Sequence, residues 1–441
     1  MNRKVVRIHN PQAALPSCKK VRICNNKTSN PGFSFPGIEA YSTRSMTDRG
    51  GVTIVADCGN ARSLRVAHAY YRSIGLGPDD LVLVSAPDGD LYQAILHDEM
   101  LCRMITRLVR EEGYKIEFFC TRDSFELDFL REIGLDWTDT VSHPPELSGR
   151  FNNKAWLRKW ATVHKFGHLF PSHRIVRSKT KLVRWARKML RQHREIVIKP
   201  PAWASGSGMV FGSDMSVVEL YMKQFGGVVP DGTIIEESLG AGHQAMSIVV
   251  RFHRGTEVDR WWSEQECPQK DSSVVHEGSI LGSMPHVTGE DVIWMNEATA
   301  PLYALLLEEY PNLTGIINFD CARDRNGNRY ILECNARVTF STYLHDIRVA
   351  IRQQILIAVT PVDYAEATCL VRKVVPTKAR DFDAVAQVLG SSLLTNSRGP
   401  GVIPIVLGCL STSGYCYLVA IGNWYSEVIQ IMAEARQKLG A

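Results

Sequence analysis

Residues 315–337, GIINFDCARDRNGNRYILECNAR, constrain this chain most, because they read as a β-hairpin that brings two carboxylates together. Asn326-Gly327 is a two-residue turn signal between two apolar runs. Counting outward from that turn places Asp320 directly opposite Glu333. Cross-strand neighbours have Cβ atoms only about 5 Å apart, and like charges at that distance repel each other. We therefore expect a positively charged group between the two acids.

Polar residues gather on one face of this expected hairpin. Because side chains alternate along a strand, Asn318 shares a face with Asp320, and Asn335 and Arg337 share it with Glu333. The other face is apolar and carries Ile317, Phe319, Cys321, Leu332 and Cys334. Carboxylate and amide oxygens suit Mg²⁺, which completes its shell with water and substrate phosphates. The sequence thus predicts a magnesium site at Asp320, Glu333 and Asn335, with Mn²⁺ as an alternative ion.

A simpler interpretation of the hairpin stays open. Asp320 and Glu333 could be solvated acids on an exposed sheet face, each paired with Arg323 or Arg337. Single carboxylates are most often solvated. This interpretation does not account for the two asparagines that face each other beside the acids.

The second informative stretch is Glu195–Gly212, EIVIKPPAWASGSGMVFG. A short apolar strand ends at Lys199, and a segment of small residues follows. A lysine at a strand end can hold phosphate oxygens while the backbone N–H groups of a glycine-rich loop cradle them. An ordinary turn is an equally good interpretation of Gly206 and Gly208. The stretch contains neither GxxxxGK[ST] nor a GxGxxG that opens a helix, which disfavours P-loop and Rossmann cofactor sites.

Taken in order, these pieces resemble the ATP-grasp ligases, which clamp ATP between two α+β lobes. The resemblance spans roughly residues 150–360. It implies that Lys154 and Lys199 contact the phosphates of ATP and that Asp320, Glu333 and Asn335 bind the metal. It also implies that a mobile loop at Ala204–Met209 covers the phosphates through Ser205, Gly206, Ser207 and Gly208. It further implies that Ile234–Leu239 is the adenine-binding hinge, with Glu236, Glu237 and Leu239.

Two further positions matter for this resemblance. Arg337 matches an arginine that many members direct at the reacting carboxyl or phosphoryl oxygens, so Arg337 and Lys199 are the expected catalytic residues. Family members usually hold the ribose hydroxyls with a glutamate after the hinge. This chain has Gln244 there, which can make one such hydrogen bond.

The pattern of strands and helices predicts several units. Residues 1–45 read as a loosely held polar extension, and residues 46–149 alternate strands with helices, as a small parallel α/β domain does. Pro144 to Gly149 reads as a linker. The expected ATP-grasp domain covers 150–360, and a small α+β domain covers 361–441. The fold class we expect is therefore α+β, with an α/β N-terminal domain.

Composition restricts the class of protein. At 441 residues, with 45% hydrophobic and 22% charged residues, the chain suits a large soluble enzyme of two or three domains. Its net charge of +5 favours anionic ligands but is too small to indicate nucleic acid. We expect no membrane partner and a cytoplasmic protein, because no apolar run has the length of a signal or membrane segment. The 11 cysteines include no CxxC and read as reduced thiols.

The three-part arrangement and the tail, VRKVVP…GVIPIVLGC…YCYLVAIGNWY, resemble the pheganomycin-type peptide ligases. That resemblance implies a donor carboxylate from a guanidino-bearing amino acid derivative, an amino-acid or peptide acceptor, and a role in peptide natural-product biosynthesis; it allows a homodimer. The expected reaction activates the donor as an acyl phosphate and joins it to an amine. An ATP-grasp kinase and a non-catalytic nucleotide-binding module are the alternatives, and the presence of all three metal ligands disfavours the second.

One aromatic cluster has two interpretations. Trp261-Trp262, with Glu264 and Glu266, could form an acidic pocket that holds a guanidinium group. More often such a cluster packs its tryptophans into a core.

Overall fold

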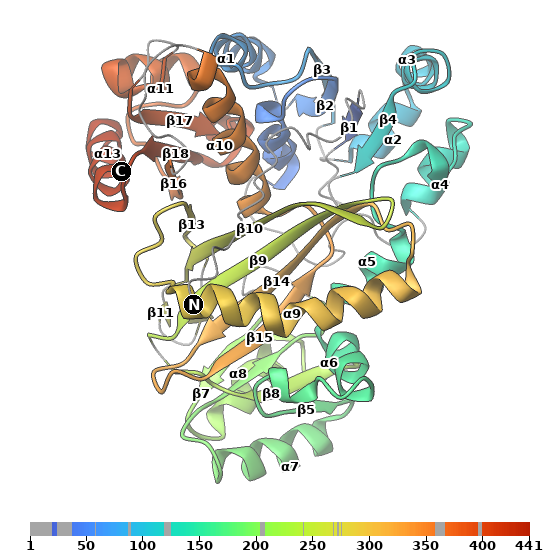
Figure 1. The fold of residues 1–441 in the computed structure, drawn as a ribbon, viewed down its shortest axis with the longest axis vertical. Coiled ribbons are helices and arrows are strands. Elements are labelled where there is room, and N and C mark those ends of the chain that lie inside the picture. Colours follow the sequence, from blue (N-terminus) through green and yellow to red (C-terminus); the bar gives the residue numbers. More distant parts are fainter. Residues whose placement is uncertain are drawn as a thin grey trace, which may run out of the picture.

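The computed structural model describes residues 20–23, 38–57, 59–86, 90–118, 125–202, 208–240, 242–267, 269–270, 273–274, 276–357, 367–395 and 399–441. Figure 1 shows three layers along the long axis of the molecule: a parallel sheet and the C-terminal helices at one end, a long antiparallel sheet across the middle, and a small sheet with its helices at the other end. None of the helices in these ranges is long and apolar enough to cross a membrane.

The N-terminal part is a four-stranded parallel sheet in the order β3-β2-β1-β4. Its strands are β1 Lys20–Ile23, β2 Val52–Asp57, β3 Asp80–Ser85 and β4 Lys115–Phe118. Its helices are η1 Ile38–Thr47, α1 Ala61–Ser73, α2 Leu91–Leu96, α3 Glu99–Arg110, α4 Phe125–Glu132 and η2 Trp137–Asp139. Apolar residues of these strands and helices form a separate core, as expected for an α/β unit.

Two expectations about the first 150 residues are wrong. Lys20–Ile23 pairs with both β2 and β4, so this part of the expected polar extension is an inner strand of the sheet. Its short run of alternating residues, KVRI, is too brief to stand out from the polar sequence around it. The expected linker at Pro144 to Gly149 is instead part of helix α5 Pro145–Phe151, which starts with proline at N1, where the missing N–H is not needed.

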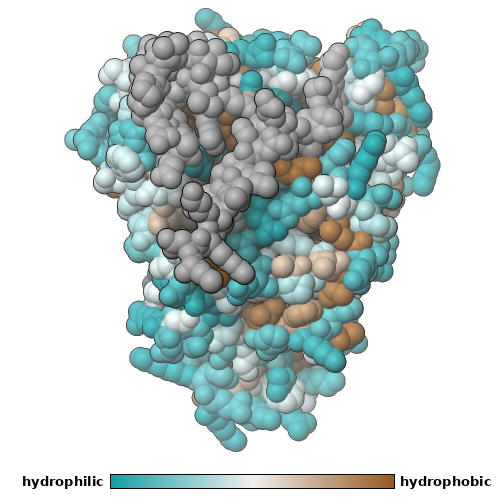
Figure 2. Space-filling model, viewed as in Figure 1, coloured by the Kyte–Doolittle hydropathy of each residue, from teal (hydrophilic) through white to brown (hydrophobic). Residues whose placement is uncertain are grey.

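The small sheet at the opposite end is antiparallel, in the order β5-β8-β6-β7. Its strands are β5 His173–Val176, β6 Ile196–Lys199, β7 Val210–Gly212 and β8 Thr233–Glu237. The helices of this region are α6 Lys154–Val163, η3 Gly167–Leu169, α7 Lys179–Leu190 and α8 Ser216–Gln224. Helix α7 buries Leu182, Ala186 and Met189 against this sheet, and its remaining residues are mostly basic. This end of the molecule is largely hydrophilic on the face shown in Figure 2.

The central sheet has eight strands in the order β15-β14-β9-β10-β13-β16-β18-β17. They are β9 Gln244–His253, β10 Thr256–Glu266, β13 Gly278–Leu281, β14 Gly315–Arg323, β15 Arg329–Asn335, β16 Thr368–Val374, β17 Gly401–Ile405 and β18 Cys416–Gly422. Two short strands, β11 Gln269–Lys270 and β12 Ser273–Val274, pair with each other. The accompanying helices are α9 Gly289–Glu309, α10 Phe340–Ile357, α11 Phe382–Leu389, η5 Gly390–Ser392, α12 Gly408–Ser413 and α13 Tyr425–Leu439.

The C-terminal strands are not a separate sheet. Strand β16 pairs with β13, so the region expected as a third domain extends the sheet that carries the hairpin. Helix α9 packs against the central sheet on one face, where Met295 and Leu302 join the core of β9 and β14. On the other face, Leu344 and Ile347 of α10 pack with residues of the C-terminal strands. The polar residues of the hairpin point toward this second face.

Candidate active site

Strands β14 and β15 form the expected antiparallel hairpin. Asp320 pairs with Glu333 and Asn318 pairs with Asn335, which confirms the predicted register at the four polar positions. The expected two-residue turn is wrong. The N–H of Asp324 donates to the carbonyl of Asn328 at 2.9 Å, and the intervening loop has three residues, ending in Gly327 with φ +87°. Glycine adopts this left-handed conformation without steric cost.

A bulge restores the register that the longer loop would shift. Between Asp320–Glu333 and Cys321–Ile331 the pairing skips one residue, so Leu332 is extra on β15. The predicted apolar face is therefore wrong at one position: Ile331, and not Leu332, packs in the core. Bulges are common beside active sites, because they redirect backbone and side chains. Here the carbonyl of Leu332 is free to accept a hydrogen bond of 3.0 Å from Arg158 Nη2.

The two opposed acids differ in how readily they ionise. Burial, followed by the negative charge of Glu333, raises the pKa of Asp320 to about 7. Gln265 Nε2 donates to Asp320 Oδ1 at 2.7 Å, and Asn335 Nδ2 donates to Asp320 Oδ2 at 2.7 Å. Asn318 Nδ2 also reaches Asp320 Oδ1, at 3.1 Å. Two like charges at this spacing cannot both be ionised without a compensating cation.

The expected positive group is Lys154. Its Nζ lies 2.7 Å from Glu333 Oε2. Burial opposes ionisation of Glu333, but Lys154 and the charge of Arg337 outweigh it and lower the pKa of this carboxyl. Glu333 therefore ionises more readily than Asp320.

A second charged group lies where the small sheet meets the hairpin. Lys199 Nζ lies 2.5 Å from Glu236 Oε1, and Arg158 contacts the other oxygen of Glu236. Both Arg158 and Glu236 are fully buried. Lys199 and Arg158 thus hold both oxygens of the Glu236 side chain inside the protein, and the adenine contact of the hinge stays a prediction.

The remaining candidate residues lie at several places. Glu237 accepts a hydrogen bond of 2.8 Å from the N–H of Ser172, and Leu239 follows the end of β8. Gln244 begins β9, donates to the carbonyl of Ala245, and alternates onto the face opposite Ser247 and Asp320. Gly208 has φ +70°. Ser205, Gly206 and Ser207 lie outside the described residues, as does most of the expected mobile loop at Ala204–Met209.

Sequence reasoning missed two residues of this site. Arg158 is four residues after Lys154, so both face the same side of helix α6, and that spacing is a signal that could have been used. Gln265 comes from β10, two strands away from β14. Its contact with Asp320 follows from the order of strands in the sheet, which no local pattern indicates.

The proposed aromatic pocket is not formed by the two tryptophans. Trp261 is buried and stacks on His345 with ring centroids 4.1 Å apart. Trp262 points to the opposite face and packs with the core of α9. The acids are also occupied, since Glu264 accepts from His286 and Glu266 pairs with Arg372.

The chemistry of the hairpin fits a divalent cation. In the described ranges, no three His, Cys, Asp or Glu side chains come together in a metal-binding arrangement. The hairpin offers two carboxylates and neighbouring amides, a set that suits Mg²⁺ when substrate phosphates complete the shell. Asn318 Oδ1 is buried and has no hydrogen-bond partner among the described residues, so this oxygen acceptor is unused.

Comparison with known proteins supports the fold. No protein-family model and no curated protein sequence matches the chain. Among solved structures, the ADP complex of N5-carboxyaminoimidazole ribonucleotide synthetase is 14% identical, with a TM-score of 0.53, covering 95% of this chain and 96% of that chain. The L-amino acid ligase of Bacillus licheniformis is 13% identical, with a TM-score of 0.51 and coverages of 95% and 97%.

A third similar structure is the biotin carboxylase domain of Hydrogenobacter thermophilus 2-oxoglutarate carboxylase, crystallised with MgADP, ADP and bicarbonate. It is 13% identical, with a TM-score of 0.55, covering 95% of this chain and 89% of that chain. Each of these three structures matches the fold of this protein over 95% of the chain. The chain therefore has the ATP-grasp fold over nearly its whole length.

Proposed function

We propose that this protein is an ATP-dependent ligase that joins a carboxylate to an amine and releases ADP and phosphate. The observation that carries the proposal is the opposition of Asp320 and Glu333 on one hairpin of an ATP-grasp fold. Two of the similar structures hold ADP, and a third is an L-amino acid ligase.

Magnesium fits the hairpin as the companion of ATP. Asp320 and Glu333 would bind it with Asn335, whose amide presents its oxygen after a simple flip. Bound there, Mg²⁺ supplies positive charge to the phosphate oxygens of ATP. It would also offset the burial and the repulsion by Glu333 that together raise the pKa of Asp320.

Three cations lie beside the acids of the site and can approach the triphosphate once Mg²⁺ offsets the hairpin carboxylates. Lys154 pairs with Glu333, and Arg158 and Lys199 pair with Glu236. Phosphoryl transfer needs little covalent help from a protein, so positioning and electrostatic stabilisation are the main tasks. Arg158 is fully buried and holds Glu236 in place, whereas Lys154 and Lys199 keep slight exposure and are the candidates for contact with phosphate.

The proposed reaction has two steps. In the first, an oxygen of the donor carboxylate attacks the γ-phosphorus of ATP, the bond to the β-phosphate oxygen breaks, and an acyl phosphate and ADP form. In the second, the amine attacks the acyl carbon, the amine loses a proton, and phosphate leaves. Arg337 follows the metal-binding strand by two residues, and its charge acts on Glu333, so we assign it to stabilise the oxyanion of the second step.

The substrate class that we propose is the one implied by the resemblance to pheganomycin-type ligases. The donor is an amino acid derivative, including guanidino-bearing ones, and the acceptor is an amino acid or peptide. The product belongs to peptide natural-product biosynthesis. The sequence of residues 369–425, which contains the tail motif, supports this proposal.

Trapping with hydroxylamine tests the reaction. The purified protein is incubated with Mg²⁺, ATP, hydroxylamine and, one at a time, the standard L-amino acids and a guanidino-bearing phenylglycine. An acyl phosphate gives a hydroxamate and ADP, and the Glu333→Gln variant gives neither. Formation of ADP together with a stable phosphate ester of a hydroxyl substrate, and no hydroxamate, would assign the chain to the kinases instead.

A further inference from the structure

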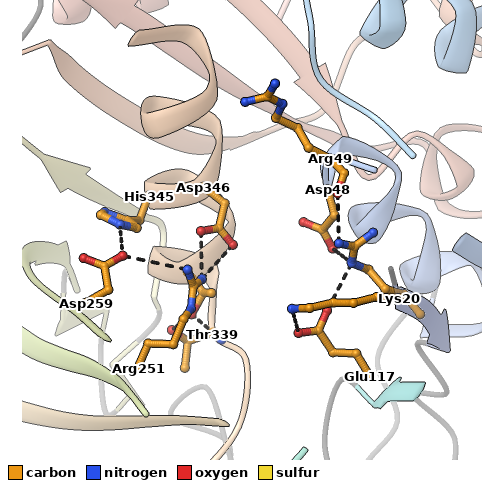
Figure 3. Close-up of polar contacts among 11 residues, drawn as sticks. Lys20, Asp48, Arg49, Glu117, Arg251, Asp259, Thr339, His345 and Asp346 are labelled. Carbon is orange, nitrogen blue, oxygen red and sulfur yellow. Dashed lines mark hydrogen bonds and ion pairs between the residues drawn. The ribbon is translucent and has the colours of Figure 1, made fainter. Parts of the chain in front are cut away.

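A polar cavity of about 270 Å³ lies outside the proposed ATP site, between the N-terminal sheet and helix α10. One wall carries Lys20, Asp48 and Glu117, and the other carries Arg251 and Asp346. Figure 3 shows the two walls as separate groups of ion pairs that face each other. Among the described residues, no hydrogen bond or ion pair joins a member of one group to a member of the other.

The cavity shares a sheet face with the hairpin acids. Arg251 pairs with Ile316 on β14, four residues before Asp320. At 3.3 Å per residue this spacing corresponds to about 13 Å along the strand. The cavity is therefore a neighbour of the proposed metal site and does not include its residues.

The first wall contains an acid whose carboxylate accepts no hydrogen bond from the described residues. The Asp48 side chain is only 15% exposed, and its nearest cation is Arg22, whose Nε lies 3.7 Å from Oδ2. No described residue donates a hydrogen bond to this carboxylate. Burial raises the pKa of Asp48 to about 7, with Asp346 and Glu117 adding to the effect and Arg22 and Lys20 opposing it. A donor with positive charge would stabilise the ionised form.

Cations with unused donors line the same cavity. Arg251 gives Nη2 to both oxygens of Asp346, at 2.8 and 2.9 Å, while its Nη1 is 3.8 Å from Asp259 and too far for a hydrogen bond. Lys20 Nζ has three protons and one described partner, Glu117, at 2.6 Å. These two cations can therefore receive the carboxylate of a ligand.

The lining carries both signs of charge, which suits a zwitterion. Four cations line the cavity, Lys20, Arg22, Arg49 and Arg251, together with the three acids Asp48, Glu117 and Asp346. A phosphate or dicarboxylate could pair with the cations, but it would bring no donor to Asp48, whereas the ammonium group of a zwitterion would. The rest of the lining includes Ile23, Phe118, Ile316 and Val338, which suit a small aliphatic side chain. The volume lies just below the usual range of ligand pockets, about 300–1,000 Å³, so the ligand must be small.

We propose that this cavity binds a small aliphatic α-amino acid, with its ammonium group on Asp48 and its carboxylate on Arg251 and Lys20. The site is separate from the metal centre and does not depend on the proposed ligase reaction. Helix α10, which carries Asp346, begins three residues after Arg337, so the bound amino acid would contact the segment that follows the proposed catalytic arginine.

Calorimetric titration without nucleotide tests the site. L-Valine is the probe. Isovalerate, which lacks the ammonium group, and isobutylamine, which lacks the carboxylate, are the control analogues. We expect L-valine to bind saturably, with a Kd at least tenfold lower than that of either analogue. Absence of saturable binding by L-alanine, L-valine and L-leucine alike, or equal binding by isovalerate, would overturn the proposal.

Variants locate the binding. Asp48→Asn and Arg251→Gln should each weaken L-valine binding at least tenfold, whereas Asp128→Asn, an exposed acid of the same N-terminal part, should not change it. Asp48→Asn replaces a carboxylate that accepts no hydrogen bond from the described residues by a group of equal size, so this variant remains informative if Arg251→Gln fails to fold. Glu333→Gln changes the proposed metal site and leaves the lining of the cavity intact, so it should keep L-valine binding. Loss of L-valine binding in Glu333→Gln, with full binding in Asp48→Asn, would place the amino acid at the hairpin and refute the proposal.

Discussion

The ammonium group of Lys154 lies 2.7 Å from Glu333 Oε2 and joins two segments that are far apart in the sequence. Lys154 is the first residue of helix α6, and Glu333 lies on strand β15. The cation that balances the acid pair therefore comes from the helix packed below the hairpin and not from the hairpin itself. Lys154 can thus offset the negative charge of the acid pair. In the proposed complex the same lysine would also contact the phosphates of ATP.

Replacing Glu333 with Gln should abolish turnover and leave the fold intact. The change removes a charge from a polar face and no core contact, while Mg²⁺ loses a carboxylate ligand. We expect a loss of at least about 100-fold in ADP formation, comparable to the loss of one electrostatic group in an active site. Glu99→Gln, at an exposed glutamate of α3, is the control and should behave as the unmodified protein. Near-normal turnover in Glu333→Gln would remove this residue from the metal site.

Helix α6 offers a matched pair of lysines. Lys154 is buried beside Glu333, whereas Lys159, on the same helix, is exposed. Lys154→Met should raise the KM for ATP by about tenfold or more, since it removes a positive charge from the proposed phosphate site. Lys159→Met should leave the KM unchanged, and initial rates of ADP release at varied ATP measure both. Equal effects of the two substitutions would show that Lys154 acts only through the overall charge of the helix.

The buried Arg158 should be essential for stability. Arg158→Met leaves the buried Glu236 with Lys199 as its ion-pair partner among the described residues and leaves the carbonyl of Leu332 without this donor. Breaking a buried ion pair in this way costs about 3–5 kcal/mol of folding free energy. Urea unfolding followed by circular dichroism measures the change, with Arg187→Met on the exposed side of α7 as a control that should cost less than about 0.5 kcal/mol. A cost below 1 kcal/mol for Arg158→Met would mean that the core adapts around the missing charge.

Asp48 should make the stability of the protein depend on pH. Its pKa rises from 3.8 in the unfolded chain to about 7 in the folded protein, so the folded state keeps this proton when the unfolded state has lost it. Stability therefore falls as the pH rises from about 4 to about 7, by at most about 4 kcal/mol. Asp48→Asn removes this loss. Its melting temperature should exceed that of the unmodified protein at pH 8 and match it near pH 4. If the difference in melting temperature between the two proteins is the same at both pH values, Asp48 does not titrate in this range.

Oxygen-18 in the donor carboxylate should follow the proposed chemistry. One labelled oxygen forms the bond to the γ-phosphorus, so it leaves with phosphate when the amine displaces it. Mass spectrometry should find one labelled oxygen in each released phosphate once the amine is added. Unlabelled phosphate with amide product would show that the carboxylate is activated in another way.

The sequence alone determined the local features of the site. Alternation along β14 and β15 and a glycine turn signal are properties of neighbouring residues, so they identified the shared face of Asp320 and Glu333 correctly. The same local reasoning failed at the loop, where three residues replace two, and at Leu332, which forms the bulge. Turn signals identify where a chain reverses better than they identify how many residues it uses.

The tertiary structure decided everything that depends on the packing of distant segments. Gln265 reaches Asp320 only because β9 lies between β10 and β14, and Arg158 reaches Glu236 only because α6 packs against both β8 and β15. Strand β1 is placed in the same way, by pairing with β2 and β4 further along the chain, and the cavity brings together Asp48 and Arg251, which are more than 200 residues apart. Secondary structure follows from periodicity over a few residues, whereas these contacts follow from how complete sheets and helices bury their apolar faces against one another.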